Sequence, residues 1–498
     1  MTEKNSSAPD HGDMPLTEFR NASEMLVTWI GRHFQNLDAT PVLPDIKPGE
    51  IRRRLPPGPP RSGEAMSTIL ADVDKIIMPG MTHWNHPSFF AYFSITGSGP
   101  GVLGEFLSAV FNINGMLWKS CPAATELEQV TLDWLRQMLG LPHDFWGIIY
   151  DTASISTMHA IAAAREQLAE LRIREQGMAG RPELPRLRLY ASEHAHSSID
   201  KAAIALGLGM RGVRKIAVDE HFRMNPQALQ DAITEDRRAG WRPFCTVATV
   251  GTTSTTSIDP VPAIGYICQQ EEMWLHVDAA YGGAAAVVPE MRHVLAGCER
   301  ADSLVVNPHK WLFVPVDSSA FFTRKPELLK RAFSLVPEYL RTREDDEVEN
   351  YMDYGLQLGR RFRALKLWFV LRYFGVDGIA ERIRTHCKLA QTFATWIDQH
   401  EAFERMAPVV FSTVCFRARP RGVAVSELNA LNEKLLESVN ATRTLFLSHT
   451  KLNGQFVLRL AIGNLRTELR HVREAWQVVQ EVLRRIREPD APDVKRQM

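Results

Sequence analysis

The stretch SLVVNPHKWLF places a lysine directly after a short apolar run that is typical of a buried strand. Lys310 follows Asn307 and His309, and an earlier run of the same kind, WLHVD, ends in Asp278. Two more such runs lead into the hydroxyl-rich segment GTTSTTSID and into EHAHSS, which contains His196. A single aspartate or lysine at a strand end is usually a turn residue. An amine, a carboxylate, imidazoles and hydroxyls at successive strand ends together indicate a catalytic site.

The combination of a lysine amine and an aspartate suits one chemistry particularly well. Lys310 could bind pyridoxal phosphate (PLP) covalently as a Schiff base, while Asp278 keeps the pyridine nitrogen protonated. The phosphate then needs an anion site, and Thr152, Ala153 and Ser154 stand at the predicted start of a helix. Free N–H groups and the helix dipole hold anions at such a position. An ordinary helix N-cap explains these three residues equally well on local sequence alone.

The elements that carry these residues alternate from about residue 130 to 325. The strand-like runs are RLRLYAS (186–192), RKIAVD (214–219), FCTVATV (244–250), WLHVD (274–278) and SLVVN (303–307). Between two of them, NPQALQDAITEDRRAG is typical of a helix, with Asn225 as N-cap and Pro226 at the first helical position. This alternation predicts an α/β fold with a mostly parallel sheet covered on both faces. The right-handed crossover rule then places the carboxyl ends of the strands at one edge, where such sheets bind ligands.

The flanking segments predict two further units. Residues 1–97 contain two helical patterns around the Pro-rich segment RRRLPPGPPRSGE, and they lack a core of their own, so we expect an N-terminal helical arm that packs on a second subunit. Residues 98–365 form the predicted large cofactor-binding domain. Residues 366–498 mix strand-like runs with a long final helical pattern from Thr467, which predicts a small α+β domain.

Composition narrows the class of protein. The 498 residues include 45% hydrophobic side chains, and 58 Lys+Arg balance 58 Asp+Glu, so charge gives no reason to expect nucleic acid or an anionic membrane as partner. The six cysteines are scattered, which argues against a zinc cluster or a disulfide framework. The polar start MTEKNSSAPDHGD and the lack of a run of about 18 apolar residues predict a soluble, cytoplasmic protein with reduced thiols.

Two motifs favour structural roles over binding roles. GPGVLG (99–104) matches the G-x-G-x-x-G pattern, but it follows an aromatic run rather than a clean strand, so dinucleotide binding is not expected. The pair His83 and His86 in HWNH has no third ligand at a suitable spacing, so we predict no metal site.

Six segments together carry a resemblance to a known family: HPSFFAYF, CPAATELE, AHSS, HVDAAYGG, NPHKW and LGRRFRALKLWFV. The chain resembles the PLP-dependent group II amino-acid decarboxylases, most closely the aromatic L-amino-acid decarboxylases, over roughly residues 15–485. The resemblance implies the type I PLP-dependent (aspartate aminotransferase-like) fold and a homodimer with a swapped N-terminal arm. It also implies PLP as cofactor, an aromatic L-amino acid as substrate, and release of CO2 to give the amine.

By the same resemblance, individual residues acquire expected roles. Lys310 matches the covalent cofactor anchor and Asp278 the partner of the pyridine nitrogen, while His196 and Ala280 match the residues that contact the two faces of the cofactor ring. Tyr339, in FSLVPEYLRTREDDEVE, matches a catalytic tyrosine on a mobile loop. The resemblance further places Thr152, Ala153, Ser154, Asn307 and His309 around the phosphate and Lys310, Thr253 near the substrate, and Trp84, Tyr92, Phe93 and Met116 at an apolar substrate pocket.

Several positions depart from the family pattern and leave the substrate open. Ser94 and Ile95 stand where animal relatives have Pro and Thr, Asn114 and Met116 stand where Ile and Phe are usual, and Ile155 replaces a common glutamate. Three alternatives to decarboxylation therefore stay open: an aldehyde synthase that passes the electrons to O2, a PLP-dependent aminotransferase or lyase, and a non-catalytic scaffold. The presence of both Tyr339 and His196 favours the decarboxylase.

Overall fold

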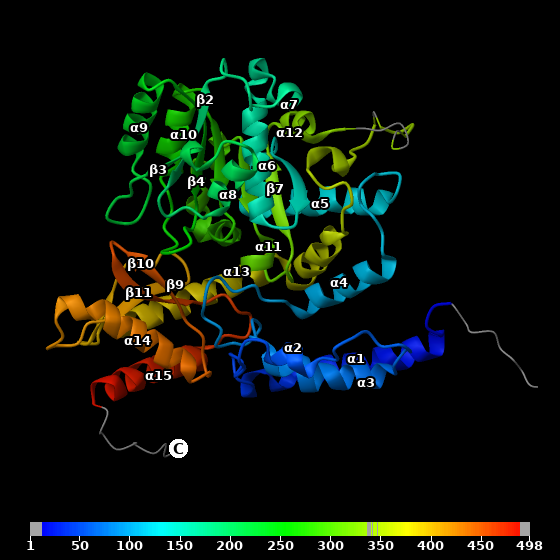
Figure 1. Ribbon diagram of the computed structural model, residues 1–498, viewed down its shortest axis with the longest axis vertical. Coiled ribbons are helices and arrows are strands. Elements are labelled where there is room, and N and C mark those ends of the chain that lie inside the picture. Colours follow the sequence, from blue (N-terminus) through cyan, green and yellow to red (C-terminus); the bar gives the residue numbers. More distant parts are fainter. Residues whose placement is uncertain (1–11, 336–339, 341, 346, 489–498) are drawn as a thin grey trace, which may run out of the picture.

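A seven-stranded sheet forms the centre of the large domain in the computed structural model, which describes residues 12–335, 340, 342–345 and 347–488 (Figure 1). The strand order is β1-β7-β6-β5-β4-β2-β3. Strands β2 to β6 pair in parallel, and β7 lies antiparallel between β6 and β1. The strands are β1 (Trp146–Tyr150), β2 (Arg186–Ser192), β3 (Val213–Ile216), β4 (Trp241–Thr249), β5 (Trp274–Asp278), β6 (Ser303–Val306) and β7 (Ser319–Thr323). The predicted α/β fold with a mostly parallel sheet is confirmed.

Helices cover both faces of this sheet, which explains why β5 and β6 are continuous apolar runs that are buried throughout. One face packs against α5 (Pro122–Leu139), α9 (Pro226–Arg238) and α10 (Val261–Gln270). The other packs against α6 (Ala153–Glu166), α8 (Ser198–Ala205) and α12 (Pro326–Phe333). Helix α9 begins as the sequence predicts, because the Asn225 side chain accepts the N–H groups of Gln227 and Ala228 at 2.9 and 3.1 Å.

The small domain is built on a four-stranded antiparallel sheet in the order β10-β11-β9-β8. Its strands are β8 (Phe403–Arg405), β9 (Thr413–Ala418), β10 (Ser448–Leu452) and β11 (Gln455–Ala461), and it carries α14 (Leu428–Ala441) and α15 (Leu469–Arg487). Side chains from the sheet and both helices form a separate apolar core, which includes Phe416, Leu435, Leu458 and Val479.

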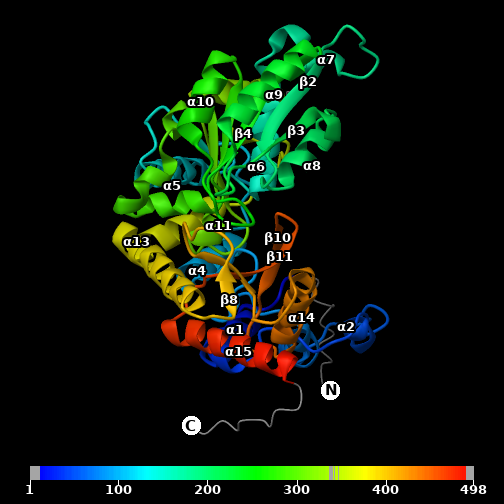
Figure 2. The same ribbon diagram turned by 90° about the vertical axis from the view of Figure 1, so that its left-hand side faces the viewer.

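One long helix, α13 (Arg363–Asp398), joins the two domains (Figure 2). It is kinked at Gly375, whose φ of 65° and ψ of 171° are not helical. Leu367 and Val370, before the kink, pack in the core of the large domain, whereas Phe393, after it, packs in the core of the small domain. The division that the sequence places at residue 365 therefore falls inside a helix that both domains share.

The N-terminal arm contains α1 (Leu16–Asn36), α2 (Glu50–Arg54) and α3 (Met66–Asp72), and it lies beside the small domain (Figure 1). Its apolar side chains remain largely uncovered in the single chain: Leu16 is 73% exposed and Val27 is 64% exposed. The following helix, α4 (Gly99–Phe111), likewise leaves Leu103 and Val110 more than half exposed. The described chain thus presents an extended apolar surface on the arm and α4.

The GPGVLG segment forms the first turns of α4 and packs closely against α13. A Cβ added to Gly104 would lie 2.7 Å from the Cα of Lys366, which is too close for any side chain. The glycine at position 104 therefore lets two helix backbones approach. Within the described ranges, no helix is long and apolar enough to cross a membrane.

Candidate active site

Three neighbouring strands bring the predicted polar residues to one edge of the sheet. Asp278 ends β5, in register with Thr249 at the end of β4 and with Val305 of β6. After β6 the chain passes Asn307 and forms the one-turn helix α11 (Pro308–Trp311), which contains Lys310. These residues enclose a cavity of about 180 Å³. Its wall consists of Phe93, Thr152, Ala153, Ser154, His196, Thr249, Gly251, Thr253, Asp278, Ala280, Tyr281, Asn307, His309 and Lys310. The nine residues that the family resemblance places around the cofactor therefore lie on one wall, together with Thr253, which it places near the substrate.

The environment of Lys310 makes its ammonium group easier to deprotonate. Burial lowers the pKa of the Lys310 ammonium, and the negative charge of Asp278 partly opposes this effect. The Asp278 carboxylate is itself buried, and one of its oxygens accepts the N–H of Ala280 at 3.1 Å. This hydrogen bond fixes the carboxylate at the strand end. A lysine with a depressed pKa beside a fixed carboxylate is the pair that covalent amine chemistry requires.

His309 is held in its neutral form beside Lys310. Its Nδ1 accepts the backbone N–H of Ser318 at 2.9 Å, and burial lowers its pKa to about 4. The proton therefore resides on Nε2, which lies 3.3 Å from the side-chain amide of Asn307. His309 thus acts as a rigid, uncharged wall next to the lysine.

His196 follows β2 on the opposite side of the cavity. Its Nδ1 accepts the N–H of Ser198 at 3.1 Å, which orients the imidazole at the start of α8. Burial lowers the pKa of His196, with Asp278 opposing the shift, so the ring is predominantly neutral at pH 7. His196 lines the cavity, and a neutral imidazole can stack on a flat ligand, which is the role that the resemblance implies.

The features on the cavity wall fit a phosphorylated aromatic cofactor. Thr152 is the N-cap of α6, and Ala153 and Ser154 occupy its first turn, where backbone N–H groups lack helical partners. Two buried atoms of the wall, Thr249 Oγ1 and Asn307 Oδ1, have no hydrogen-bond partner among the described residues. Such atoms are expected where a polar ligand completes the site. The anion site, the carboxylate and the amine together match the three polar parts of PLP.

An aromatic stack closes the cavity and was only partly foreseen. Phe93 lies parallel to Tyr281 with ring centroids 4.0 Å apart, and Tyr281 stacks in turn on Trp311 at 4.7 Å. The Tyr281 hydroxyl pairs with Ser412 Oγ of the small domain at 2.6 Å. Sequence reasoning overlooked Tyr281, Thr249 and Gly251 as wall residues. Tyr281 lies three residues after Asp278, which ends β5, so this closeness to the strand end was a signal in the sequence.

The remaining predicted residues lie apart from this wall. Trp84 and Tyr92 pack against each other, with centroids 5.7 Å apart, and belong to a neighbouring cluster with Phe446. Met116 packs against a different cluster that includes Leu340 and Met352. Of the four predicted substrate-pocket residues, only Phe93 borders the described cavity. Tyr339 lies outside the described residues.

Comparisons with known proteins agree with this geometry. Residues 48–419 match the family described as "Pyridoxal-dependent decarboxylase conserved domain". A phenylacetaldehyde synthase of Rosa hybrid cultivar is 40% identical, with 93% of each chain covered. An aromatic-L-amino-acid decarboxylase of Bos taurus is 41% identical, with 94% of this chain and 96% of that one covered. The crystal structure of Oryza sativa TDC with PLP and tryptamine superposes with a TM-score of 0.91 at 34% identity, covering 95% of this chain and 99% of that one.

Proposed function

Because the chain belongs to the pyridoxal-dependent decarboxylase family, we propose that it releases CO2 from an aromatic L-amino acid and forms the corresponding amine. Its cofactor is pyridoxal phosphate, and its reaction class is amino-acid decarboxylation. The observation that carries the proposal is the shared cavity wall, on which Lys310, Asp278 and the first turn of α6 face the same space.

The residues of this wall have different roles in the proposed reaction. Lys310, with its lowered pKa, supplies the amine that holds the cofactor and exchanges with the amino group of the substrate. Asp278 keeps a proton on the pyridine nitrogen, and the α6 N-terminus binds the phosphate. Bound PLP supplies an electron-accepting ring that takes up the electron pair left on Cα when CO2 departs. His196 covers one face of the site and limits the positions available to the substrate.

The aromatic preference rests on Phe93. Its ring borders the cavity, and the Lys310 Nζ lies 5.3 Å from its centroid. An aromatic side chain can pack against Phe93 without placing an unpaired polar group there. The wall carries one carboxylate, Asp278, and its only lysine or arginine is Lys310.

An aldehyde synthase is the second candidate, because one relative of 40% identity bears that name. In that reaction O2 oxidises the reacting Cα after CO2 has left, and the products are aldehyde, ammonia and hydrogen peroxide. We favour the decarboxylase since the chain has a tyrosine at position 339 and a histidine at position 196, both of which the decarboxylase pattern contains.

We also propose that the active protein is a cytoplasmic homodimer. The uncovered apolar side chains of α1 and α4 support the dimer, because a second copy could bury them. All six cysteines have free thiols, which supports a reducing compartment.

The test is a product assay combined with mapping of the cofactor lysine. Purified enzyme should release CO2 and amine from L-phenylalanine, L-tyrosine or L-tryptophan faster than from L-glutamate, with little aldehyde or peroxide. Borohydride reduction should leave the pyridoxyl group on Lys310. Lys366→Met is the matched control, because Lys366 is a second buried lysine whose pKa is lowered by burial, to about 8, and it pairs with Glu105 at 2.8 Å. An adduct on Lys366, or aldehyde as the main product, contradicts the proposal.

A further inference from the structure

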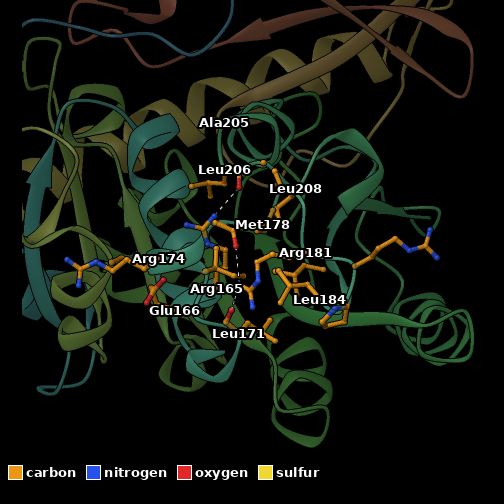
Figure 3. Close-up of a pocket in the computed structure, with 18 of the residues that line it drawn as sticks. Arg165, Glu166, Leu171, Arg174, Met178, Arg181, Leu184, Ala205, Leu206 and Leu208 are labelled. Carbon is orange, nitrogen blue, oxygen red and sulfur yellow. Dashed lines mark hydrogen bonds between the residues drawn. The ribbon is translucent and has the colours of Figure 1, made fainter.

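A second, larger cavity lies at the opposite edge of the sheet from Lys310. It has a volume of about 910 Å³ and is formed by the end of α6, the segment 171–187, the segment 205–211 and Trp241 (Figure 3). Strand β2 begins at Arg186 beside this cavity and ends at Ser192 on the active-site side. The two cavities therefore lie at opposite ends of the same strand. The volume is in the range of small-molecule sites.

The wall of this cavity has an unbalanced charge. It contains the five arginines Arg165, Arg174, Arg181, Arg186 and Arg211, but only one carboxylate, that of Glu166. The Glu166 carboxylate is already engaged, since Arg331 Nε lies 3.5 Å from it. Arg181 is also engaged, because its Nε contacts Glu183 at 2.7 Å. We call the cavity the arginine pocket.

Arg165 is the residue whose hydrogen bonding is incomplete. Its Nη1 donates to the carbonyl oxygen of Leu206 at 2.9 Å, whereas its Nε is buried and has no partner among the described residues. Burial lowers the pKa of the Arg165 guanidinium, and the nearby Glu166 only partly offsets this effect. The cavity does not reach this buried N–H, but no described residue accepts a hydrogen bond from Nη2 of Arg165. An oxyanion that contacts Nη2 would therefore be bound favourably.

The guanidinium group of Arg211 is a second positive charge on the wall of the arginine pocket. It lines the pocket, it is exposed, and no described residue forms a side-chain hydrogen bond or ion pair with it. Figure 3 shows Arg165, Arg181 and Met178 in the middle of the pocket, whereas Arg174 extends to its side. The rest of the wall is apolar and includes Leu171, Met178, Leu184, Leu206 and Leu208. A ligand that is complementary to both the arginines and the apolar side chains of the wall has a negatively charged group attached to an apolar group.

We propose that the arginine pocket binds an amphipathic oxyanion, a carboxylate or phosphate monoester attached to a ring or short alkyl chain, with Arg165 and Arg211 holding the negative group. The same wall disfavours amino acids and amines. Their ammonium group would lie among guanidinium groups, and Glu166, the one carboxylate of the wall, is already paired with Arg331. The pocket is thus distinct in ligand class from the proposed active site.

Isothermal titration of the PLP-loaded enzyme tests the proposal with three probes of similar size. These are 3-phenylpropanoate, phenyl phosphate and the neutral 3-phenylpropanol. We expect one or both anions to bind with a dissociation constant below about 1 mM, and the alcohol to bind at least about tenfold more weakly, as loss of a charge-assisted hydrogen bond implies. The anion that binds more tightly identifies the preferred negative group.

Three variants locate the binding. Arg165→Met and Arg211→Gln should each weaken anion binding about tenfold or more, and Arg211→Gln lies at an exposed position that does not threaten folding. Arg242→Gln is the matched control, because Arg242 is exposed at the start of β4 but is not part of the wall. Anion binding within the active site is recognised separately, because it inhibits decarboxylation competitively and persists in the Arg165 and Arg211 variants. Equal binding of the alcohol, or an equal effect of all three substitutions, overturns the proposal.

Discussion

The ring of Phe93 lies parallel to the ring of Tyr281, at a centroid distance of 4.0 Å and an interplanar angle of 11°. Phe93 comes from the segment that precedes α4, whereas Tyr281 follows β5. The stacked rings of Phe93 and Tyr281 therefore connect the N-terminal region with the end of β5, which carries Asp278. Because Tyr281 also stacks on Trp311, the residue after Lys310, the aromatic ring that borders the cavity is connected with the one-turn helix that carries Lys310.

Replacing Phe93 with leucine should weaken the selectivity for aromatic substrates. The leucine keeps apolar bulk but loses ring stacking, which typically contributes about 0.5–1.5 kcal/mol. We expect kcat/KM for the best aromatic amino acid to fall about three- to tenfold, with less change for an aliphatic one. Trp84→Leu is the control within the same chain, because Trp84 packs outside the described wall. An equal loss in both variants argues that Trp84 borders the substrate in the assembled enzyme.

Asp278→Asn should retain PLP but lose most of its activity. The amide can still accept the Ala280 N–H, but it cannot hold a proton on the pyridine nitrogen, so kcat should fall by about 10²-fold or more. Cofactor absorbance and turnover are measured on the same sample. Asp302→Asn is a matched control, since Asp302 accepts the Leu275 N–H at the opposite edge of the sheet. Near-normal turnover of Asp278→Asn rejects the electronic role.

Stability should decrease as pH falls from about 6.5 toward 4. Burial lowers the pKa of His386 to about 4, so the unfolded chain binds a proton in this window that the folded protein does not bind. The free energy of unfolding therefore rises with pH, by about 1.4 kcal/mol per pH unit for each such histidine. His86, His276 and His309 have pKa values lowered to about 4 in the same way.

His386→Gln isolates one of these contributions. Glutamine can accept the Trp311 indole N–H and donate to the Asn464 carbonyl oxygen, as His386 does at 3.0 and 3.1 Å, but it does not titrate. Urea unfolding of the PLP-loaded enzyme at pH 7, 6 and 5 should give a slope that is shallower by about 1 kcal/mol per pH unit on average, because the unfolded histidine is only partly protonated near pH 7. Parallel slopes for wild type and variant contradict the assignment.

Val110→Asp should separate the proposed dimer. Val110 is 56% exposed on α4, and a carboxylate there would be buried without a partner if a second subunit covers this face. Light scattering should show monomers, and activity should decrease with dissociation. Val425→Asp is the matched control at a 74% exposed position of the small domain, and it should remain dimeric. A fully active Val110→Asp monomer rejects the requirement for a dimer.

Tyr339→Phe separates the two candidate reactions. The proposed role of the phenol is to return a proton to Cα after CO2 leaves, so the variant should form amine about 10²-fold more slowly and divert material to aldehyde under air. The amine-to-aldehyde ratio is measured with and without O2. Tyr373→Phe is a control at a tyrosine that is 73% exposed on α13. An unchanged rate and ratio in Tyr339→Phe rejects this role of the phenol.

The sequence predicted the part of the fold in which local pattern and burial agree. Apolar runs such as 274–278 coincide with β5 because parallel strands are buried on both faces. Strands β1 and β7 were not assigned, since their antiparallel pairing, Trp146 with Thr323, joins residues far apart in the chain. The Phe93–Tyr281 stack likewise depends on tertiary packing. Residue types at strand ends could identify the chemistry, but not which aromatic side chains surround it.

Helix α13 has a consequence for how this chain folds. The core of the large domain needs Leu367, Val370 and Ile383, which the ribosome makes after every strand of the central sheet. A nascent chain that ends at residue 365 would leave the apolar side chains on that face of the sheet uncovered. Helix α13 also packs in the core of the small domain. The segment that completes the large domain is therefore also the first element of the small domain. The two domains are therefore expected to complete folding in one concerted step near the end of synthesis, rather than one after the other.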